Sequence, residues 1–316
     1  MEHYRQTKAE HNFLKRGGLT VKKSLVIGAV FVDVVMNVPR LPISGEDITS
    51  KSQTYVIGGS AFNVYGAIKY VDAAGDLFAP IGRGQYADMI RAELTKRQIP
   101  VKLPVDTGDN GWDISLVEPN GERTFLTVQG VEQNWKSDWF NRINIFDYDF
   151  FYISGYELED ETVADIIMDW LDGRKENSRI LFDMSPRIPY LTNKTIDRLL
   201  SSGVLVHGNF EELSVLMPLG AGIEEKASRL YRKTKSPVII TCGNKGSFYF
   251  DGHKLTKFPS ETSEVLNTLG AGDSHSGGIL AGLSKNMDLG DAVKLGNQLA
   301  ELVITKEEGS LTRLKL

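Results

Sequence analysis

The chain of 316 residues has one cysteine, Cys242, so an intramolecular disulfide is excluded and a reducing compartment is indicated. It has no apolar run approaching the roughly 18 residues of a membrane span. Its first twenty residues lack the apolar stretch of a secretory signal. We therefore expect a cytoplasmic protein with no membrane contact.

Positive charge is also in short supply, since 36 Lys and Arg face 41 Asp and Glu. A nucleic-acid-binding protein normally shows a basic excess or stripe, so that class is disfavoured. The five histidines show no metal-ligand spacing with one another or with Cys242. The composition is that of an ordinary globular protein, and the chain is long enough for one large α/β domain or two smaller ones.

The order of patterns favours an α/β fold. Strands and helices alternate from residue 149 onward, which indicates βαβ units and a parallel sheet. The apolar run 24–35 predicts a further strand buried on both faces. Residues 112–117 and 123–126 flank Pro119-Asn120-Gly121 and predict a hairpin. With the alternating residues 46–57, this hairpin would supply a small second sheet.

Residues 267–278 carry the pattern with the clearest chemistry. Gly270, Ala271 and Gly272 open a helix and would leave backbone N–H groups uncovered, which makes an anion site. Asp273 follows in the first turn. It could take a proton from an alcohol while the N–H groups hold charge developing on a phosphoryl group. From spacing alone, a plain glycine turn with an aspartate at the helix start is the commoner explanation.

Other polar residues follow predicted strands. Asp33 interrupts the first apolar run, near the expected carboxyl end of its strand, and Asp183 ends a later run. Because ligands of open α/β sheets bind at the carboxyl ends of strands, both aspartates are candidates for ligand binding. The pair Gly58-Gly59 would let a ligand approach a helix whose first turn carries Asn63.

Asn209 and Glu212 have the spacing of a helix capping box, which by itself accounts for both residues.

A rival pattern lies at residues 82–87, which fit the dinucleotide fingerprint G-x-G-x-x-A between a predicted strand and a helix. Asp106 lies at about the spacing expected of a ribose-binding acid. A whole βα unit precedes the pattern, whereas the fingerprint belongs on the first strand of its domain. An oxidoreductase, or a nucleotide-binding protein without turnover, stays open as an alternative.

Residues 267–278 resemble the signature D-T-x-G-A-G-D-x-F-x-G-G of the ribokinase-like (PfkB) carbohydrate kinases, and residues 58–63 resemble their G-G-x-x-x-N. Asn267 and His275 depart from the usual Asp and Phe. The resemblance implies a three-layer α/β/α fold with a mostly parallel central sheet. It further implies a kinase domain at 23–316 after a tail at 1–22, with lid strands from about 37–57 and 109–128.

The resemblance also implies an ATP-dependent kinase that transfers the γ-phosphate to a primary hydroxyl of a sugar and uses Mg²⁺. The roles implied are catalysis by Asp273 with Gly270, Ala271 and Gly272; substrate binding by Asp33, Gly58, Gly59, Asn63 and Trp112; nucleotide binding by Asn209, Thr241, Gly243, Gly246 and Asn297; and Mg²⁺ binding through water by Asp183, Asn209 and Glu212. A nucleoside kinase of the adenosine or pseudouridine type is the alternative within this fold.

Three further expectations follow. In family members activated by potassium, the Asp at position 267 helps to bind the cation, so the neutral amide of Asn267 would weaken such a site. His275 lies two residues past Asp273 and points to another helix face, so we interpret it as a packed histidine and not a catalytic base. Exposed lid edges favour a homodimer.

Overall fold

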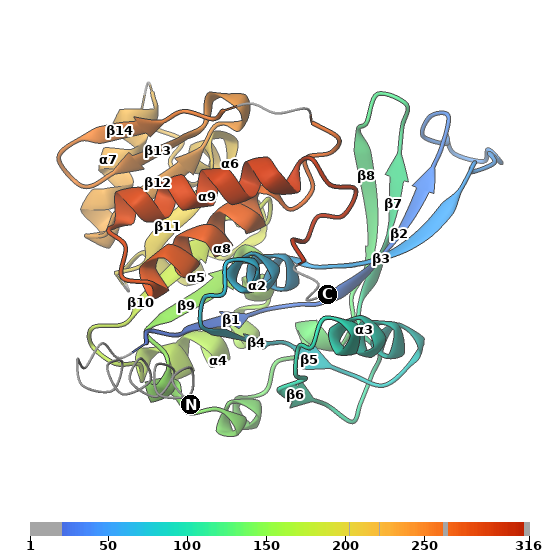
Figure 1. Cartoon of the computed structure of the whole chain (residues 1–316), viewed down its shortest axis with the longest axis horizontal. Helices are drawn as coiled ribbons and strands as arrows, with labels where there is room; N and C mark the ends of the chain where they lie inside the picture. The colour runs from blue at the N-terminus through green and yellow to red at the C-terminus, as the bar shows by residue number, and fades with distance from the viewer. Residues whose placement is uncertain (1–20, 202, 221, 262–264, 313–316) are drawn as a thin grey trace, which may run out of the picture.

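The structure is a computed structural model that describes residues 21–201, 203–220, 222–261 and 265–312. It has a layered body with a small sheet that stands out beside it (Figure 1). Of the tail predicted at 1–22, all but Val21 and Lys22 lies outside the described residues.

The body is organised around an eight-stranded sheet with the order β14-β13-β12-β11-β10-β9-β1-β4. Its strands are β1 (Ser24–Ile27), β4 (Gly75–Phe78), β9 (Phe150–Ser154), β10 (Arg179–Asp183), β11 (Leu205–Asn209), β12 (Val238–Thr241), β13 (Ser247–Phe250) and β14 (Leu255–Phe258). All are parallel except the edge hairpin β13–β14. The carboxyl ends of the parallel strands therefore meet at one edge of the sheet.

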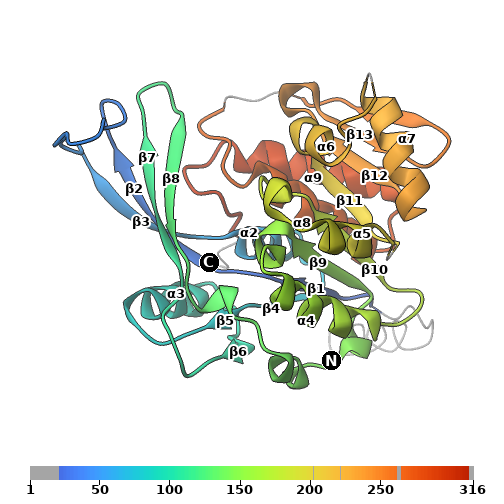
Figure 2. The ribbon, with the colours of Figure 1, turned by 180° about the vertical axis from the view of Figure 1, so that it is seen from behind.

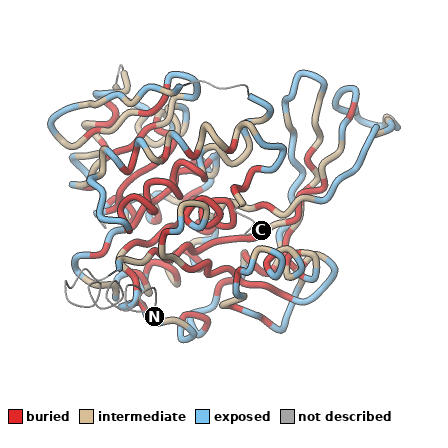
Figure 3. Tube along the Cα trace, in the orientation of Figure 1, coloured by how far each residue is buried: buried red, intermediate tan, exposed pale blue. Residues whose placement is uncertain are grey.

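Helices cover both faces of this sheet (Figures 1 and 2). On one side lie α2 (Ser60–Tyr70), α8 (Ala271–Ser284) and α9 (Leu289–Val303), and on the other α4 (Glu161–Asp172), α5 (Asn193–Ser201), α6 (Phe210–Leu216) and α7 (Ile223–Thr234). Alternate residues of β9 serve the two cores, with Tyr152 packed in one and Phe151 in the other. Figure 3 shows the central strands and α8 almost wholly buried. The predicted three-layer fold is confirmed.

The small sheet has the order β3-β2-β7-β8, formed by β2 (Phe31–Asn37), β3 (Gln53–Gly58), β7 (Trp112–Val117) and β8 (Arg123–Val128). The predicted hairpin is its β7–β8 half. The run 24–35, expected as one strand, is divided between the two sheets, because the chain turns at Gly28 with φ 154°, which favours glycine. Asp33 therefore lies inside β2 and not at the carboxyl end of a central strand.

Short elements complete the chain. Helix α3 (Gln85–Lys96) packs beneath the small sheet, beside the two-stranded pair β5 (Pro80–Ile81) and β6 (Leu103–Pro104). The 3-10 helices are η1 (Val131–Gln133), η2 (Ser137–Arg142), η3 (Ile145–Asp147), η4 (Gly155–Leu158), η5 (Ile188–Tyr190) and η6 (Gly243–Lys245). None of the helices in the described part of the chain is long and apolar enough to cross a membrane.

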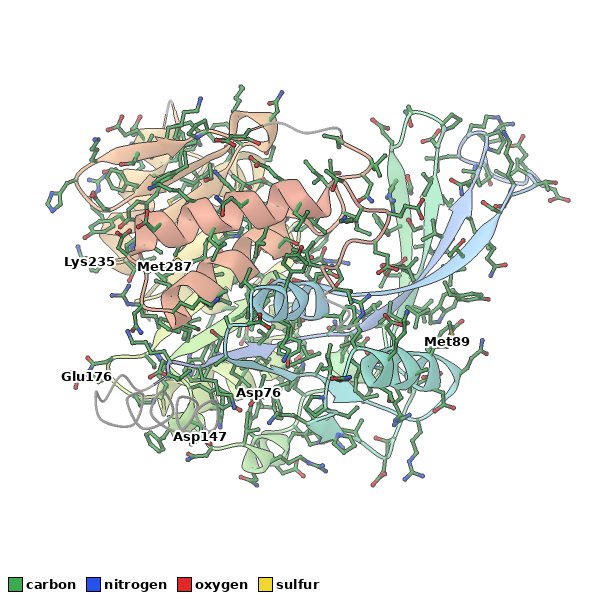
Figure 4. All side chains as sticks on the ribbon, viewed as in Figure 1. Asp76, Met89, Asp147, Glu176, Lys235 and Met287 are labelled. Atoms are coloured by element: carbon green, nitrogen blue, oxygen red, sulfur yellow. The ribbon has the colours of Figure 1, made fainter. Side chains whose placement is uncertain are left out.

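Not every buried acid belongs to a site. Asp76, labelled in Figure 4, lies at the start of β4, away from the carboxyl ends. Its carboxylate binds Lys23 at 2.6 Å, Lys102 at 3.1 Å and the hydroxyl of Tyr148 at 2.7 Å. This cluster joins the edge strand to its neighbours, so we interpret it as structural.

Candidate active site

Asp273 lies in the first turn of α8 and is held by two side chains of α2. Its Oδ1 accepts a hydrogen bond from Ser60 Oγ and its Oδ2 one from Asn63 Nδ2, both at 2.9 Å. Burial raises the pKa of the carboxyl to about 6, although the bond from Asn63 acts in the opposite sense. The residue remains partly exposed. Near neutral pH Asp273 is thus an accessible, oriented carboxylate of raised basicity.

A hydroxyl chain supports Asp273 from the central sheet. Tyr152, wholly buried on β9, lies 2.5 Å from Ser60 Oγ. Because Ser60 donates its proton to Asp273, the tyrosine must donate to Ser60. Burial raises the pKa of Tyr152 well above its usual value, so it stays a donor. This chain fixes the direction in which the carboxylate faces.

The helix behind Asp273 begins without a cap. Gly270, the residue before α8, has the left-handed φ of 72°, and within the described residues no side-chain hydrogen bond caps the helix there. A Cβ at Gly270 would overlap the carbonyl oxygen of Gly309, whereas one at Gly272 would meet nothing within 4 Å. Uncapped N–H groups and the helix dipole both favour an anion at this exposed end.

A cavity of about 340 Å³ opens beside this helix terminus. Its lining includes Thr241, Gly243, Asn244, Gly246, Ser260, Val265, Thr268, Ala271, Gly272, His275, Asn297, Ala300, Glu301 and Ile304. The residues predicted to bind the nucleotide therefore converge here, apart from Asn209. That they bind it stays a prediction.

His275 belongs to a buried chain of polar groups that runs from this cavity towards Asp183. His275 Nε2 lies 3.0 Å from Asn297 Oδ1, and its Nδ1 lies 2.9 Å from His207 Nε2. His207 Nδ1 lies 3.0 Å from Asp183 Oδ2, which also accepts from Ser276. Burial lowers the pKa of His275 well below its usual value, so the ring is neutral. Its partners are ring and amide atoms, in keeping with a packed residue.

Replacing His275 with Phe, the residue of the family signature, tests this chain. We expect a loss of about 1–3 kcal/mol in the free energy of unfolding, because buried His207 Nε2 would lose its partner. Urea unfolding of His275→Phe measures the effect. His253→Phe, at an exposed position, is the control and should change little. Equal stability of both variants would show that the His207–His275 bond contributes nothing.

Asn209 and Glu212 do form a capping box. Asn209 N donates to Glu212 Oε2 at 2.9 Å, and Glu212 N donates to Asn209 Oδ1 at 2.8 Å. Burial, with the charge of Asp183, raises the pKa of Glu212 to about 7. No three His, Cys, Asp or Glu side chains gather into a metal cluster in the described chain. The oxygens of Asp183 and Glu212 suit Mg²⁺, which keeps much of its water, so the residues fit the predicted ion.

Asp33 faces a second acid that the sequence did not single out. Asp33 on β2 is in register with Asp113 on β7, and the two buried carboxyls share a hydrogen bond. Burial raises the pKa of both carboxyls, and the neighbouring charge of Asp33 raises that of Asp113 further. Two carboxyls in hydrogen-bond contact favour a state in which they share one proton. The carboxyl of Asp33 also touches Gly58, where a Cβ would overlap it.

Glu157 is a further acid that sequence reasoning missed. It follows β9 in η4, is 2% exposed, and accepts a hydrogen bond from Ser154 Oγ at 2.7 Å. Burial raises its pKa to about 7. A Cβ at Gly28, just past the end of β1, would lie 2.8 Å from its carboxyl. The strand-end argument applied to Asp183 would have found it.

Trp112 lies on the other face of the small sheet. It alternates with Asp113 along β7, and its ring stacks on Tyr86 of α3 with centroids 5.2 Å apart. Its contact with substrate remains a prediction, and the structure places it away from the face that carries Asp33.

The dinucleotide pattern at 82–87 has a structural use. Asp109 Oδ2 accepts from Tyr86 N at 3.1 Å, and its Oδ1 accepts from Ala87 N at 2.7 Å. A carboxylate thus fills the N-terminus of α3, where a dinucleotide would place its pyrophosphate. A Cβ at Gly84 would overlap Asp109, which explains that glycine.

Asn267 acts as a donor where the family has a carboxylate. Its Nδ2 donates to the carbonyls of Lys306 at 2.6 Å and Glu307 at 3.0 Å, and its Oδ1 accepts from Leu269 N at 2.7 Å. The amide therefore joins the loop before α8 to the segment after α9. An Asp here would set a carboxylate against two carbonyl oxygens.

Asn267→Asp should therefore lower the unfolding free energy by about 1–3 kcal/mol in buffer without potassium or sodium, through lost hydrogen bonds and repulsion. A cation held between the carboxylate and the carbonyls should restore part of this loss. Thermal unfolding with and without potassium chloride checks both effects. Asn141→Asp, at an exposed position, is the control. If potassium chloride raised the unfolding temperature of Asn267→Asp no more than that of wild type, a cation would not be held by the new carboxylate.

A model described as pfkB family carbohydrate kinase matches residues 21–314, so the chain belongs to this family. It is therefore a phosphotransferase with an alcohol acceptor.

Individual relatives agree with that assignment. The chain is 34% identical over 295 residues to the uncharacterized sugar kinase YegV of Escherichia coli, covering 92% of this chain and 91% of that protein. It is 26% identical over 301 residues to adenosine kinase of Saccharomyces cerevisiae, covering 87% and 86%. Ribokinase of Cryptococcus neoformans in complex with ADP matches with a TM-score of 0.77 at 21% identity, covering 92% and 96%.

Proposed function

We propose that the protein is an ATP-dependent carbohydrate kinase that transfers the γ-phosphoryl group to a primary hydroxyl of a sugar. One observation carries this proposal: the oriented carboxylate of Asp273 lies in the first turn of an uncapped helix beside a cavity. The carboxylate can accept the proton of an alcohol, and the N–H groups at the start of the helix can stabilise the negative charge of a phosphoryl group.

In this mechanism Asp273 takes the proton of the acceptor hydroxyl as the hydroxyl oxygen attacks the γ-phosphorus. The bond from the γ-phosphorus to the β–γ bridging oxygen breaks, and ADP leaves. Ser60 and Asn63 hold the carboxylate in place, and the N–H groups around Gly272 stabilise the charge on the phosphoryl oxygens. Mg²⁺, held through water by Asp183, Asn209 and Glu212, would supply further charge neutralisation. The nucleotide would occupy the cavity lined by Thr241, Gly243, Gly246 and Asn297.

The acceptor would lie between Asp273 and the small sheet. Asp33, Gly58 and Gly59 would hold its hydroxyls, and the small sheet would act as the lid. We also expect a homodimer through this sheet, because the edge strand β8 exposes Phe125, Leu126 and Val128. The reaction draws on ATP, so the cytoplasm remains the expected location.

The test is ADP release from Mg·ATP over a panel of pentoses, hexoses, ketoses and nucleosides. Turnover on a free sugar would support the proposal. Turnover on nucleosides alone would favour the second candidate, a nucleoside kinase, which the similarity to yeast adenosine kinase keeps open. Absence of turnover with ATP still bound would count against both.

The pH profile gives a further prediction. Asp273 must be unprotonated to act as a base, and burial raises its pKa to about 6. The kcat/KM should therefore fall as the pH drops through about 6 and level off above it. Initial rates between pH 4.5 and 8.5 check this. A profile flat down to pH 5 would contradict a base with this pKa.

A further inference from the structure

Two side chains on the face of the small sheet that carries Asp33 have no role in the scheme above. Asp113 and Ser115 lie two apart on β7 and so point the same way. The register sets Asp113 opposite Asp33 and Ser115 opposite Val35 on β2. Asp113 is 8% exposed and Ser115 is 1% exposed. A carboxyl and a hydroxyl are thus buried in a sheet whose other face stacks aromatic rings.

Both side chains have a polar atom without a partner. Asp113 Oδ1 and Ser115 Oγ find no hydrogen bond within the residues that the structure describes, and neither does Asn63 Oδ1. Buried polar atoms are nearly always paired, so each exception calls for a ligand, a water or a strained state. Asn63 itself bonds to Asp273, and Asp113 shares a hydrogen bond with Asp33, whose carboxyl lies against Gly58 just before α2. The unpaired atoms of Asn63 and Asp113 are therefore in contact with residues that we assign to the acceptor site, and Ser115 is the next residue on the same face of β7.

The chemistry of the two atoms restricts what can satisfy them. Asp113 bonds to Asp33 through its other oxygen, so its free Oδ1 is an acceptor that needs a donor, whichever of the two acids holds the proton. Ser115 carries a hydroxyl proton that needs an acceptor. A single hydroxyl group can donate to Asp113 and accept from Ser115. An ammonium group can only donate, and an apolar group would leave both atoms unpaired.

We propose that Asp113 and Ser115 bind a hydroxyl of the acceptor other than the one phosphorylated, and so select polyhydroxylated acceptors that carry a hydroxyl facing β7. This inference rests on the proposed function, because it places the acceptor under the small sheet. Both atoms are closed from solvent in this structure, so the sheet must open to admit the acceptor. When the small sheet closes over an acceptor that lacks this hydroxyl, Asp113 Oδ1 and Ser115 Oγ remain unpaired. Binding of such acceptors is therefore disfavoured.

Binding measurements test the proposal without requiring turnover. Titration calorimetry with a non-hydrolysable ATP analogue present would use D-ribose, D-fructose, D-glucose, myo-inositol, D-glucosamine and adenosine as probes. The variants are Asp113→Leu, Ser115→Ala and Asp113→Asn, with Thr124→Ala, an exposed position on the other face of β8, as the control. Thermal unfolding establishes that each variant is folded.

We expect at least one neutral polyhydroxylated probe to bind wild type, and to bind Asp113→Leu and Ser115→Ala about tenfold more weakly or worse. Asp113→Asn should bind within about threefold of wild type, because its amide donates to Asp33 and keeps an oxygen free for the hydroxyl. One monodeoxy analogue of that probe should lose affinity for wild type and not for Asp113→Leu.

The proposal is overturned if no neutral sugar or cyclitol binds, if Asp113→Leu and Ser115→Ala bind as wild type does, or if glucosamine binds better than glucose. Adenosine binding tighter than every sugar, and undiminished in Asp113→Leu, would also overturn it. The two proposals fail separately. A sugar that binds as expected but receives no phosphoryl group removes the kinase function alone. Phosphorylation undiminished in Asp113→Leu removes the role of Asp113 alone.

Discussion

Replacement of Asp273 with Asn should lower kcat by about 10²–10⁴-fold, the usual contribution of a positioned general base. The amide keeps the size of the side chain and can still accept from Ser60, but it cannot take the acceptor's proton. Affinity for the nucleotide should stay within about threefold, because the uncapped N–H groups of α8 and the cavity are unchanged. ADP release and nucleotide titration measure the two effects on the same sample.

Asp88→Asn is the matched control, since Asp88 is an exposed aspartate in the first turn of α3. It should leave both kcat and nucleotide affinity as they are. If Asp273→Asn lost turnover and nucleotide binding to the same extent, Asp273 would be a binding or structural residue, and the assignment of the base would be wrong.

Gly270→Ala should be the most disruptive single methyl group in the site. A left-handed alanine costs about 1–2 kcal/mol, and here the methyl group would also overlap the Gly309 carbonyl. Backbone near the start of α8 must shift, so we expect an unfolding free energy lower by about 3 kcal/mol or more and a marked loss of nucleotide binding. Urea unfolding and nucleotide titration provide the measurements.

Substitutions at two other glycines separate the cost of the left-handed backbone from the cost of the overlap with Gly309. Gly121 has φ 86° with nothing within 4 Å, so Gly121→Ala should show the backbone cost alone, about 1–2 kcal/mol. Gly272 lacks a positive φ and has open space, so Gly272→Ala should not lower stability. A Gly270→Ala variant no less stable than Gly121→Ala would contradict the close approach to Gly309.

Much of the body could be predicted because its signals are local. Periodicity and strand-to-helix alternation located β9, β10, β12 and α9, and the turn at Pro119-Asn120-Gly121 located the hairpin. The two sheets could not be separated in this way. Small apolar residues around Gly28 continue the hydrophobic run, so nothing in the composition marks the turn from one sheet to the other.

The candidate site could be predicted where its residues form one continuous motif. Where its residues are far apart in the sequence, the prediction was incomplete. Asp273 and the glycines before α8 lie in one stretch, and the structure sets them beside the predicted cavity lining. The sequence did not indicate Asp113, because its contact with Asp33 comes from the parallel pairing of β2 with β7, and Asp33 lies 80 residues earlier in the chain. The neighbouring Trp112 drew attention instead, and the alternation of the strand turns it to the other face. Pairing at that distance depends on the whole fold.

The most direct test of the central claim follows the phosphoryl group itself. ATP labelled at the γ-phosphate is mixed with Mg²⁺, the protein and the best acceptor of the panel, and the products are separated. We predict that the label moves onto a primary hydroxyl of a sugar with wild type and Asp88→Asn, and that Asp273→Asn shows no transfer above background. Label found only in inorganic phosphate, or transferred equally by Asp273→Asn, would contradict the proposed kinase and its base.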